Sequence, residues 1–175
     1  MILQKIIIKK ILYATDLSES ALHAFSYAVS LAGLYNAGIT ILHVLDEEPK
    51  LDNKILGYVS LSKWEEIKKR HEEDARTALI GKTSGQAFIG DVLNQFCNDA
   101  EKNLEEQKFD IDEIIVTRGH PVEQILTQAK EKAIDLIVMG THGSGTLTDA
   151  MLGSTARRVL RRSTVPVIVI RLPAE

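Results

Sequence analysis

Short apolar runs recur along the chain and predict the strands of a sheet. Such a run is mostly apolar throughout instead of alternating with polar residues, which is typical of parallel strands covered on both faces. Five runs have this character: Lys10–Thr15, Ile39–Leu45, Ile111–Val116, Ile134–Met139 and Val165–Ile170.

Segments with helical spacing lie between these runs. They are Ala21–Leu34, Ser62–Leu79, Ala87–Glu106, Val122–Ala133 and Thr155–Arg162. Asp16–Ser20 supplies helix-start residues for the first of them, and Gly38 is expected to close it. His120-Pro121 places proline at the first position of another helix. Strands that alternate with helices predict an α/β fold, a doubly wound five-stranded parallel sheet with helices on both faces and right-handed crossovers.

Residues 46–110 depart from this rhythm. Glu47–Asn53 is polar and contains a proline, so we expect a loop there, and Gly81–Gly85 separates the two helical segments that follow. We expect residues 1–175 to form a single domain with a helical insert at about 46–110. The sequence leaves three roles open for this insert: a lid, a partner surface or a structural cover.

The composition is that of an ordinary globular protein. The 175 residues are 45% hydrophobic and 26% charged, and the formal net charge is −3, so non-specific nucleic-acid binding is not expected. The one cysteine, Cys97, excludes an internal disulfide and fits a cytoplasmic setting. No apolar stretch approaches the roughly 20 residues that span a membrane, and the first ten residues lack a signal-peptide pattern.

A segment that contains several glycines follows the fourth predicted strand. Gly140-Thr141-His142-Gly143 is followed by nine residues, then Gly153-Ser154 and a predicted helix. Glycines allow backbone amides to approach a phosphate, and a helix start adds unpaired amides and positive dipole. The hydroxyls of Ser154 and Thr155 can bind phosphate oxygens or a hard cation. The segment therefore predicts a nucleotide-phosphate site, although turns and a loose helix start would also account for these glycines.

Asp16 is a second candidate because it follows the first predicted strand. Ligands of doubly wound sheets bind beyond the carboxyl ends of the strands, where the strand order reverses. Asp16 and Gly140 both lie just past strand ends. Alternatively, the Asp16 carboxylate caps the next helix, unless Ser18 does so.

Other chemically capable residues have a plainer interpretation. His142 is a candidate base or metal ligand, but a single loop histidine is more often a solvated turn residue. His43 is expected on a sheet face, and Cys97 as a buried thiol. The histidines show no metal-binding spacing, so no protein-built metal site is predicted.

Two basic features have plainer explanations than phosphate binding. Gly81-Lys82-Thr83 resembles the end of a P-loop, but Arg76 stands where that motif requires glycine. Arg161 and Arg162 fit a solvated last helical turn. Arg157 and Arg158 lie nearer the predicted phosphates, and the sequence leaves their role open.

The last strand carries a prediction about assembly. Val165–Ile170 is apolar and contains Pro166, which indicates a sheet edge. An exposed apolar edge invites pairing with another chain, and a two-fold dimer would cover it.

Three blocks of this sequence resemble the universal stress proteins. They are Ile11–Ala21, Ile39–Val44, and Asp135–Leu160 together with Val165–Ile170. The nucleotide-binding branch of that family is similar in the spacing of Gly140, Gly143, Gly153 and Ser154. The resemblance implies ATP binding, an adenine-nucleotide alpha hydrolase-like fold with strand order 3-2-1-4-5, and a homodimer made through the last strand.

The resemblance also implies roles for individual residues. Asp16 would hold the adenosine half, the Val44 backbone the adenine, and Gly140 the ribose, whereas Gly143, Gly153, Ser154 and Thr155 would hold the phosphates. The set of candidate nucleotide contacts is completed by Ala14, Thr15, Thr141, His142, Val165, Pro166 and Val167. Many relatives carry arginine where this chain has Ser144, which removes a basic neighbour of the phosphates.

Together these features predict a dimeric ATP-binding stress-response protein in which ATP acts as a regulatory ligand. Mg²⁺ or Mn²⁺ would arrive with the phosphates, held by ATP oxygens, water and Ser154. Catalysis is not expected, since no base with an orienting carboxylate and no P-loop lysine is present. Two alternatives remain: a slow ATPase or nucleotidyl transferase using His142 or Arg157 and Arg158, and a nucleotide-free interaction module with residues 46–110 as its partner surface.

Overall fold

The strands form one parallel sheet in the order β3-β2-β1-β4-β5, as predicted. The computed structural model describes residues 5–45, 55, 57–77, 85–103, 108–141 and 152–173. The strands are β1 (Lys10–Thr15), β2 (Gly38–Leu45), β3 (Asp110–Arg118), β4 (Leu136–Gly140) and β5 (Val167–Ile170). All neighbouring pairs are parallel, so the carboxyl ends of the strands meet at one edge of the sheet.

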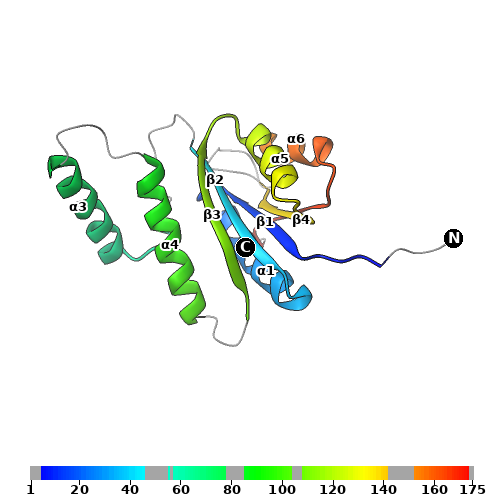
Figure 1. The fold of residues 1–175 in the computed structure, drawn as a ribbon, viewed down its shortest axis with the longest axis horizontal. Coiled ribbons are helices and arrows are strands. Elements are labelled where there is room, and N and C mark those ends of the chain that lie inside the picture. Colours follow the sequence, from blue (N-terminus) through cyan, green and yellow to red (C-terminus); the bar gives the residue numbers. More distant parts are fainter. Residues whose placement is uncertain are drawn as a thin grey trace.

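Helices cover both faces of the sheet (Figure 1). Buried residues of α1 (Glu19–Tyr35) and α4 (Gly85–Asn103) share one apolar cluster with one face of the strands. Buried residues of α5 (Pro121–Glu131) and α6 (Ser154–Arg162) share a second cluster with the other face. α3 (Leu61–Thr77) lies outside α4, against which Trp64 packs on Phe88 with ring centroids 5.0 Å apart. The fold class is therefore confirmed.

Within the described residues, no helix is long and apolar enough to cross a membrane.

Several element boundaries differ from the sequence prediction. Gly38 does not close α1, because Asn36 ends the helix in the left-handed conformation with φ 51° and Gly38 begins β2. A Cβ at Gly38 would meet the carboxylate of Asp112 on the neighbouring strand, an exposed side chain that can turn away. Ala133 also has a positive φ of 51°, and β4 begins only at Leu136.

The helical region between β2 and β3 contributes to the core. Ile55, Tyr58 and Val59 are at most 4% exposed and lie in the same apolar cluster as α1. α4 adds Phe96 and Cys97, among other residues, to this cluster. Part of the region is thus a structural cover, one of the three roles that the sequence left open. The predicted loop Glu47–Asn53 and the Gly81-Lys82-Thr83 sequence lie outside the described residues.

Cys97 is a buried thiol, as predicted. Burial is the main reason that its pKa rises to about 12, and the Glu101 carboxylate adds to the rise. Since the thiolate is the reactive form of cysteine, this side chain serves packing and not chemistry.

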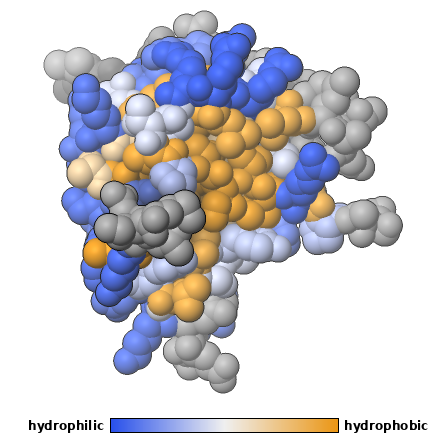
Figure 2. Space-filling model, turned by 90° about the vertical axis from the view of Figure 1, so that its right-hand side faces the viewer, coloured by the Kyte–Doolittle hydropathy of each residue, from blue (hydrophilic) through white to orange (hydrophobic). Residues whose placement is uncertain are grey.

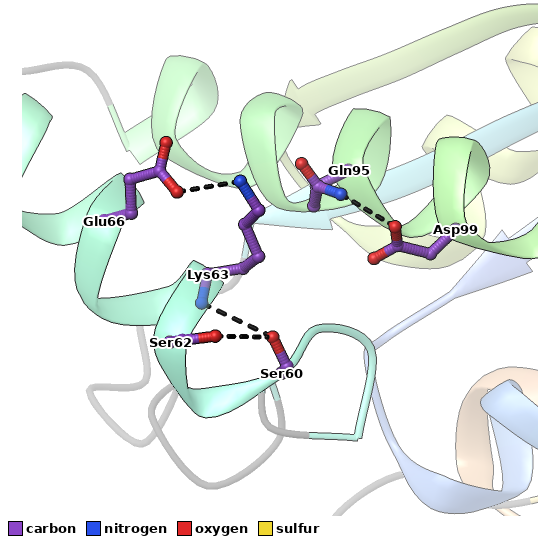
Figure 3. A network of polar contacts seen from close by, with 6 residues as sticks. All are labelled: Ser60, Ser62, Lys63, Glu66, Gln95 and Asp99. Carbon is purple, nitrogen blue, oxygen red and sulfur yellow. Dashed lines mark hydrogen bonds and ion pairs between the residues drawn. The ribbon is translucent and has the colours of Figure 1, made fainter.

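α3 starts at Leu61, two residues after the buried Val59. Ser60 caps the helix: its Oγ accepts from the Lys63 amide at 3.4 Å and lies 3.2 Å from the Ser62 hydroxyl (Figure 3). The Lys63–Glu66 ion pair in the same view is solvent-exposed, and such pairs contribute little to stability. The cap fixes where α3 begins, directly beside the buried Tyr58.

A chain of buried hydroxyl groups joins Tyr58 to β1. The Tyr58 hydroxyl lies 2.8 Å from Thr15 Oγ1 and 3.0 Å from the Tyr13 hydroxyl. Tyr13 donates to the Ala21 carbonyl at 2.7 Å, and the Leu17 amide donates to Thr15 Oγ1 at 3.0 Å.

The two ends of this chain fix the direction of every proton in it. Each hydroxyl has one proton, and Tyr13 uses its proton on the Ala21 carbonyl. Tyr13 therefore accepts from Tyr58, and Tyr58 accepts from Thr15. Burial raises the pKa of both tyrosines well above the ordinary value of 10.0, so these hydroxyls keep their protons.

Close packing of β4 on α1 brings two strand ends together. A Cβ at Gly140 would collide with Ser20 Oγ and lie 2.8 Å from the Ala21 backbone nitrogen. Only glycine allows the end of β4 to approach the first turn of α1 this closely.

We predict that Gly140→Ala lowers the free energy of unfolding by about 1–3 kcal/mol, because the backbone at Ala21 must move to admit the methyl group. Gly90→Ala in α4 is the matched control, since nothing lies within 4 Å of its added Cβ. The control should gain about 0.5–1 kcal/mol from better helix propensity. Urea denaturation measures both changes, and equal stability of the two variants would contradict the packing argument.

We also predict that two of the four tyrosines resist ionisation in the folded protein. Because the folded pKa values are raised, the neutral hydroxyls stabilise the fold fully below about pH 10, the ordinary tyrosine pKa, and this stability is lost as the pH rises further. Phenolate absorbance should show the late ionisation coinciding with unfolding. Tyr58→Phe should remove one late phenolate, and all four tyrosines titrating together before unfolding would contradict the prediction.

Candidate functional site

Two turns meet at the carboxyl ends of β1 and β4, where the strand order reverses. β1 leads into α1 on one face of the sheet, and β4 precedes α6 on the other. In open α/β sheets this position is where ligands bind. The structure thus brings together Asp16, Gly140 and Thr141, and it places the start of α6 beside them through a hydrogen bond from the Gly153 amide to the Thr141 carbonyl, 2.8 Å long.

The turn between β1 and α1 holds Asp16 in a defined position. Leu17 adopts a left-handed φ of 62°, and the Ser18 amide donates to Asp16 Oδ1 at 3.1 Å. Ser18 Oγ accepts from the Ala21 amide at 3.2 Å and is the N-cap of α1. The alternative that Asp16 caps the helix is therefore wrong. Asp16 is half-buried at the strand end.

The β4 side of the site contains an unsatisfied hydroxyl. Thr141 is 3% exposed, its amide donates to the Ile170 carbonyl at 2.9 Å, and its carbonyl accepts from Gly153. Its side-chain Oγ1 has no hydrogen-bond partner within the part of the chain that the structure describes. A buried hydroxyl without a partner costs about 1–3 kcal/mol, which is unusual unless a bound group satisfies it.

The start of α6 is open to an anion. Its N-cap is Gly153, which has no side chain to cap the helix, and its first turn carries no acidic residue. The first hydrogen bond of the helix runs from the Arg157 amide to the Gly153 carbonyl, 3.0 Å long. Within the described ranges, the amides of Ser154, Thr155 and Ala156 have no recorded acceptor. Such amides and the helix dipole favour a bound anion.

Gly153 has a narrower role than the sequence predicted. Its φ is −57°, so glycine is not required there by a left-handed conformation. Its amide is already bonded to Thr141, which leaves the following amides of α6 as the candidate phosphate donors.

The arginines of α6 divide into two groups. Arg162 forms a bidentate ion pair with Glu123 of α5, with Nη1 2.5 Å and Nη2 3.1 Å from the two carboxylate oxygens. Arg161 is exposed in the last turn. Arg157 and Arg158 are exposed near the helix start, and within the described residues neither has an ion pair.

The sequence-predicted residues on β1 and β2 have mixed roles. Ala14 and Thr15 are buried. The Thr15 hydroxyl is hydrogen-bonded to the Tyr58 hydroxyl, and the Thr15 carbonyl is hydrogen-bonded to His43 Nδ1, 2.9 Å away. Thr15 therefore stabilises the turn that holds Asp16 and does not need to contact the ligand. His43 is a buried residue of β2, as predicted, and Val44 is half-buried near the end of that strand.

The last strand does not bring its candidates to this site. β5 runs parallel to β4, with Val167 opposite Ile137 and Ile170 opposite Gly140. Val165, Pro166 and Val167 therefore lie toward the amino end of the strand, at the opposite end of the sheet from Asp16 and Thr141. β5 also begins after Pro166, and not at Val165 as predicted.

Part of the predicted site lies outside the described residues, and the structure adds one residue that the sequence did not predict. His142, Gly143 and Ser144 fall in the undescribed stretch 142–151. Sequence reasoning did not identify Tyr58 as a support of the β1 turn; the apolar positions Ile55, Tyr58 and Val59 ahead of α3 were the available signal.

Among the described residues, no group of three or more His, Cys, Asp or Glu side chains could hold a metal ion.

Comparison with known proteins identifies relatives along nearly the whole chain. The sequence model of the universal stress protein family matches residues 8–171. Universal stress protein MJ0577 of Methanocaldococcus jannaschii is 30% identical over 93% of this chain and 94% of its own length. Universal stress protein YxiE of Bacillus subtilis is 30% identical over 93% of this chain and 98% of its own.

Solved structures show the same fold. The structure of MJ0577 covers 97% of this chain and 99% of its own, with a TM-score of 0.61 and 29% identity. A universal stress protein crystallised in complex with cAMP covers 94% of this chain and 98% of its own, with a TM-score of 0.60 and 24% identity. With these matches and the predicted strand order both in place, the chain belongs to the universal stress protein family.

Proposed function

We propose that this chain binds ATP at the carboxyl ends of β1 and β4 and acts as a nucleotide-dependent regulatory protein of the stress response. One observation carries the proposal: the buried, unpartnered Thr141 hydroxyl lies beside the uncapped start of α6. Together these groups form a set of donors that lacks an acceptor within the part of the chain that the structure describes. A phosphate supplies several acceptor oxygens and the negative charge that a helix start favours.

The surrounding residues fit an adenine nucleotide. Asp16 provides a carboxylate for the hydroxyls of a ribose at the end of β1, and Val44 provides backbone at the end of the adjacent strand. A protein of the same fold has been crystallised with cAMP, which supports an adenine nucleotide as the ligand class. Gly143 and His142 complete the proposed set of contacts.

Mg²⁺ or Mn²⁺ would accompany the phosphates. Thr141, Ser154 and Thr155 offer hydroxyl oxygens, which hard cations accept, and the phosphates themselves supply the charged ligands. The ion would offset the charge of the triphosphate. The chain's own contribution is to orient the phosphates on the first turn of α6.

ATP then acts as a ligand and not as a substrate. Its effect on the protein equals the difference between its affinities for the available states. A ligand present at about 100 times its Kd stabilises the state that binds it by about 2.7 kcal/mol, which is enough to change conformation or assembly.

We predict that Thr141→Val stabilises the nucleotide-free protein by about 1 kcal/mol, because it removes an unsatisfied buried hydroxyl, yet weakens ATP binding by about fivefold to tenfold. Thr15→Val is the matched control: its buried hydroxyl is fully bonded, so its loss should destabilise the free protein by about 1 kcal/mol. Urea denaturation without nucleotide and calorimetric titration with ATP and Mg²⁺ measure the two effects.

The opposite signs make this test decisive. If wild-type protein takes up no ATP in the titration, and none leaves the purified protein on denaturation, the nucleotide proposal fails and the interaction-module alternative stands. If Thr141→Val is destabilised as Thr15→Val is, the hydroxyl has a partner in the fold and carries no argument for a ligand.

We propose further that two copies associate through β5. β5 is an edge strand, and Val167, Ile168 and Val169 are each half-buried in the isolated chain. Figure 2 shows apolar side chains gathered in a broad patch on one face of the molecule. A patch of this kind favours association, and an apolar edge strand favours pairing with a second copy of itself.

The register identifies the groups that such pairing would use. The Pro166 carbonyl accepts from Ile137 of β4, and the Ile170 carbonyl accepts from Thr141 just after β4. Alternate residues of β5 therefore face β4, and the amides of Val167 and Val169 face outward. Val169→Pro removes an outward amide without removing a bond to β4, whereas Val169→Thr keeps that amide. We predict that sedimentation shows a dimer for wild type and Val169→Thr and a monomer for Val169→Pro. A wild-type monomer at every concentration would contradict the proposal.

A further inference from the structure

We infer that Tyr58 is a positioning residue for Asp16, through which the turn ahead of α3, residues 57–60, is coupled to the nucleotide site. This inference rests on the proposed function for its ligand. The structural link itself is independent of that function, because it consists of hydrogen bonds within the protein.

The first step is the strain in the turn that holds Asp16. Leu17 has a φ of 62°, a region that costs an L-residue roughly 1–2 kcal/mol. Such a conformation persists only where the surroundings fix it. Two amide hydrogen bonds do so here: Leu17 to Thr15 Oγ1 at 3.0 Å and Ser18 to Asp16 Oδ1 at 3.1 Å.

The second step is that Thr15 does not hold this position alone. Its hydroxyl can rotate, and it accepts from Leu17 in this orientation because its own proton goes to Tyr58, 2.8 Å away. Without the Tyr58 hydroxyl, that proton has no acceptor among the described groups of the chain. The Thr15 hydroxyl would then rotate to donate its proton elsewhere and would lose the hydrogen bond that it accepts from the Leu17 amide.

The third step is the other end of the hydroxyl chain. Tyr58 donates to Tyr13, which donates to the carbonyl of Ala21 in the first turn of α1. The Ala21 backbone nitrogen is also where Gly140 packs against α1. One phenol therefore supports both turns of the site, the Asp16 turn through Thr15 and the end of β4 through Ala21.

The fourth step is the connection to α3. Tyr58 precedes the cap residue Ser60 by two positions, and the Trp64 amide donates to the Ser60 carbonyl at 2.9 Å. A displacement of the start of α3 would carry Tyr58 with it and loosen the Asp16 turn. Coupling is reciprocal, so a nucleotide bound at Asp16 would in turn hold the start of α3 in place.

The test compares Tyr58→Phe with Ile89→Val. Ile89 is 1% exposed, lies in the same apolar cluster and takes no part in the hydroxyl chain, so this variant loses stability without losing the link. Two quantities are measured: ATP affinity by calorimetry, and hydrogen exchange of the Leu17 amide in nucleotide-free protein by NMR.

We expect Tyr58→Phe to weaken ATP binding about fivefold and to speed exchange at Leu17 by a similar factor, with Ile89→Val unchanged in both. Thr15→Val should speed the same exchange. The double variant with Tyr58→Phe and Thr15→Val should exchange little faster than either single variant, since both changes break the same series of hydroxyl hydrogen bonds.

Two results overturn the inference. One is exchange at Leu17 that is the same in Tyr58→Phe and wild type. The other is a loss of affinity without faster exchange, since Tyr58 would then act by another route. If wild type binds no ATP, the proposed function fails while the Leu17 exchange still decides whether Tyr58 fixes the turn.

Discussion

The close contact between the end of β4 and the first turn of α1 is the constraint on which this structure depends. It exists because Gly140 has no side chain where Ser20 and the Ala21 backbone stand. The contact places the β4 turn beside the β1 turn, although the two turns are about 120 residues apart in the sequence. Asp16, Thr141 and the start of α6 all lie at this junction. A bulkier residue at position 140 would separate the groups that the proposed nucleotide would contact.

Much of the fold could be predicted because the strands are short, apolar and separated by amphipathic helices. That pattern has few solutions other than a doubly wound sheet, and the resemblance supplied the strand order. The residues at which helices and strands begin and end were harder to predict from the sequence. Gly38 belongs to β2 and not to the helix end, because Asn36 already ends α1 in the left-handed conformation and Gly38 pairs with Lys10 of β1. Such pairing between distant residues leaves no local pattern in the sequence.

The candidate site was predictable where it depends on chain order and not where it depends on long-range contacts. Asp16 and Gly140 were predicted to lie just past strand ends, so the rule for parallel sheets predicts that they lie close together. The role of Tyr58 arises from a contact across 43 residues of sequence, which periodicity cannot reveal. The resemblance implies nucleotide contacts by Val165, Pro166 and Val167, but the parallel direction of β5 places them at the far end of the sheet.

The Thr141 hydroxyl, which has no partner among the described residues, bears on how long the protein would survive in a cell. If the proposed nucleotide supplies that partner, an empty chain keeps an unsatisfied polar group in its interior and opens more often than a filled one. Proteases remove molecules from the open population, so occupancy and lifetime rise together. If ATP fills the position, the abundance of the protein follows the energy supply of its host without any change in synthesis.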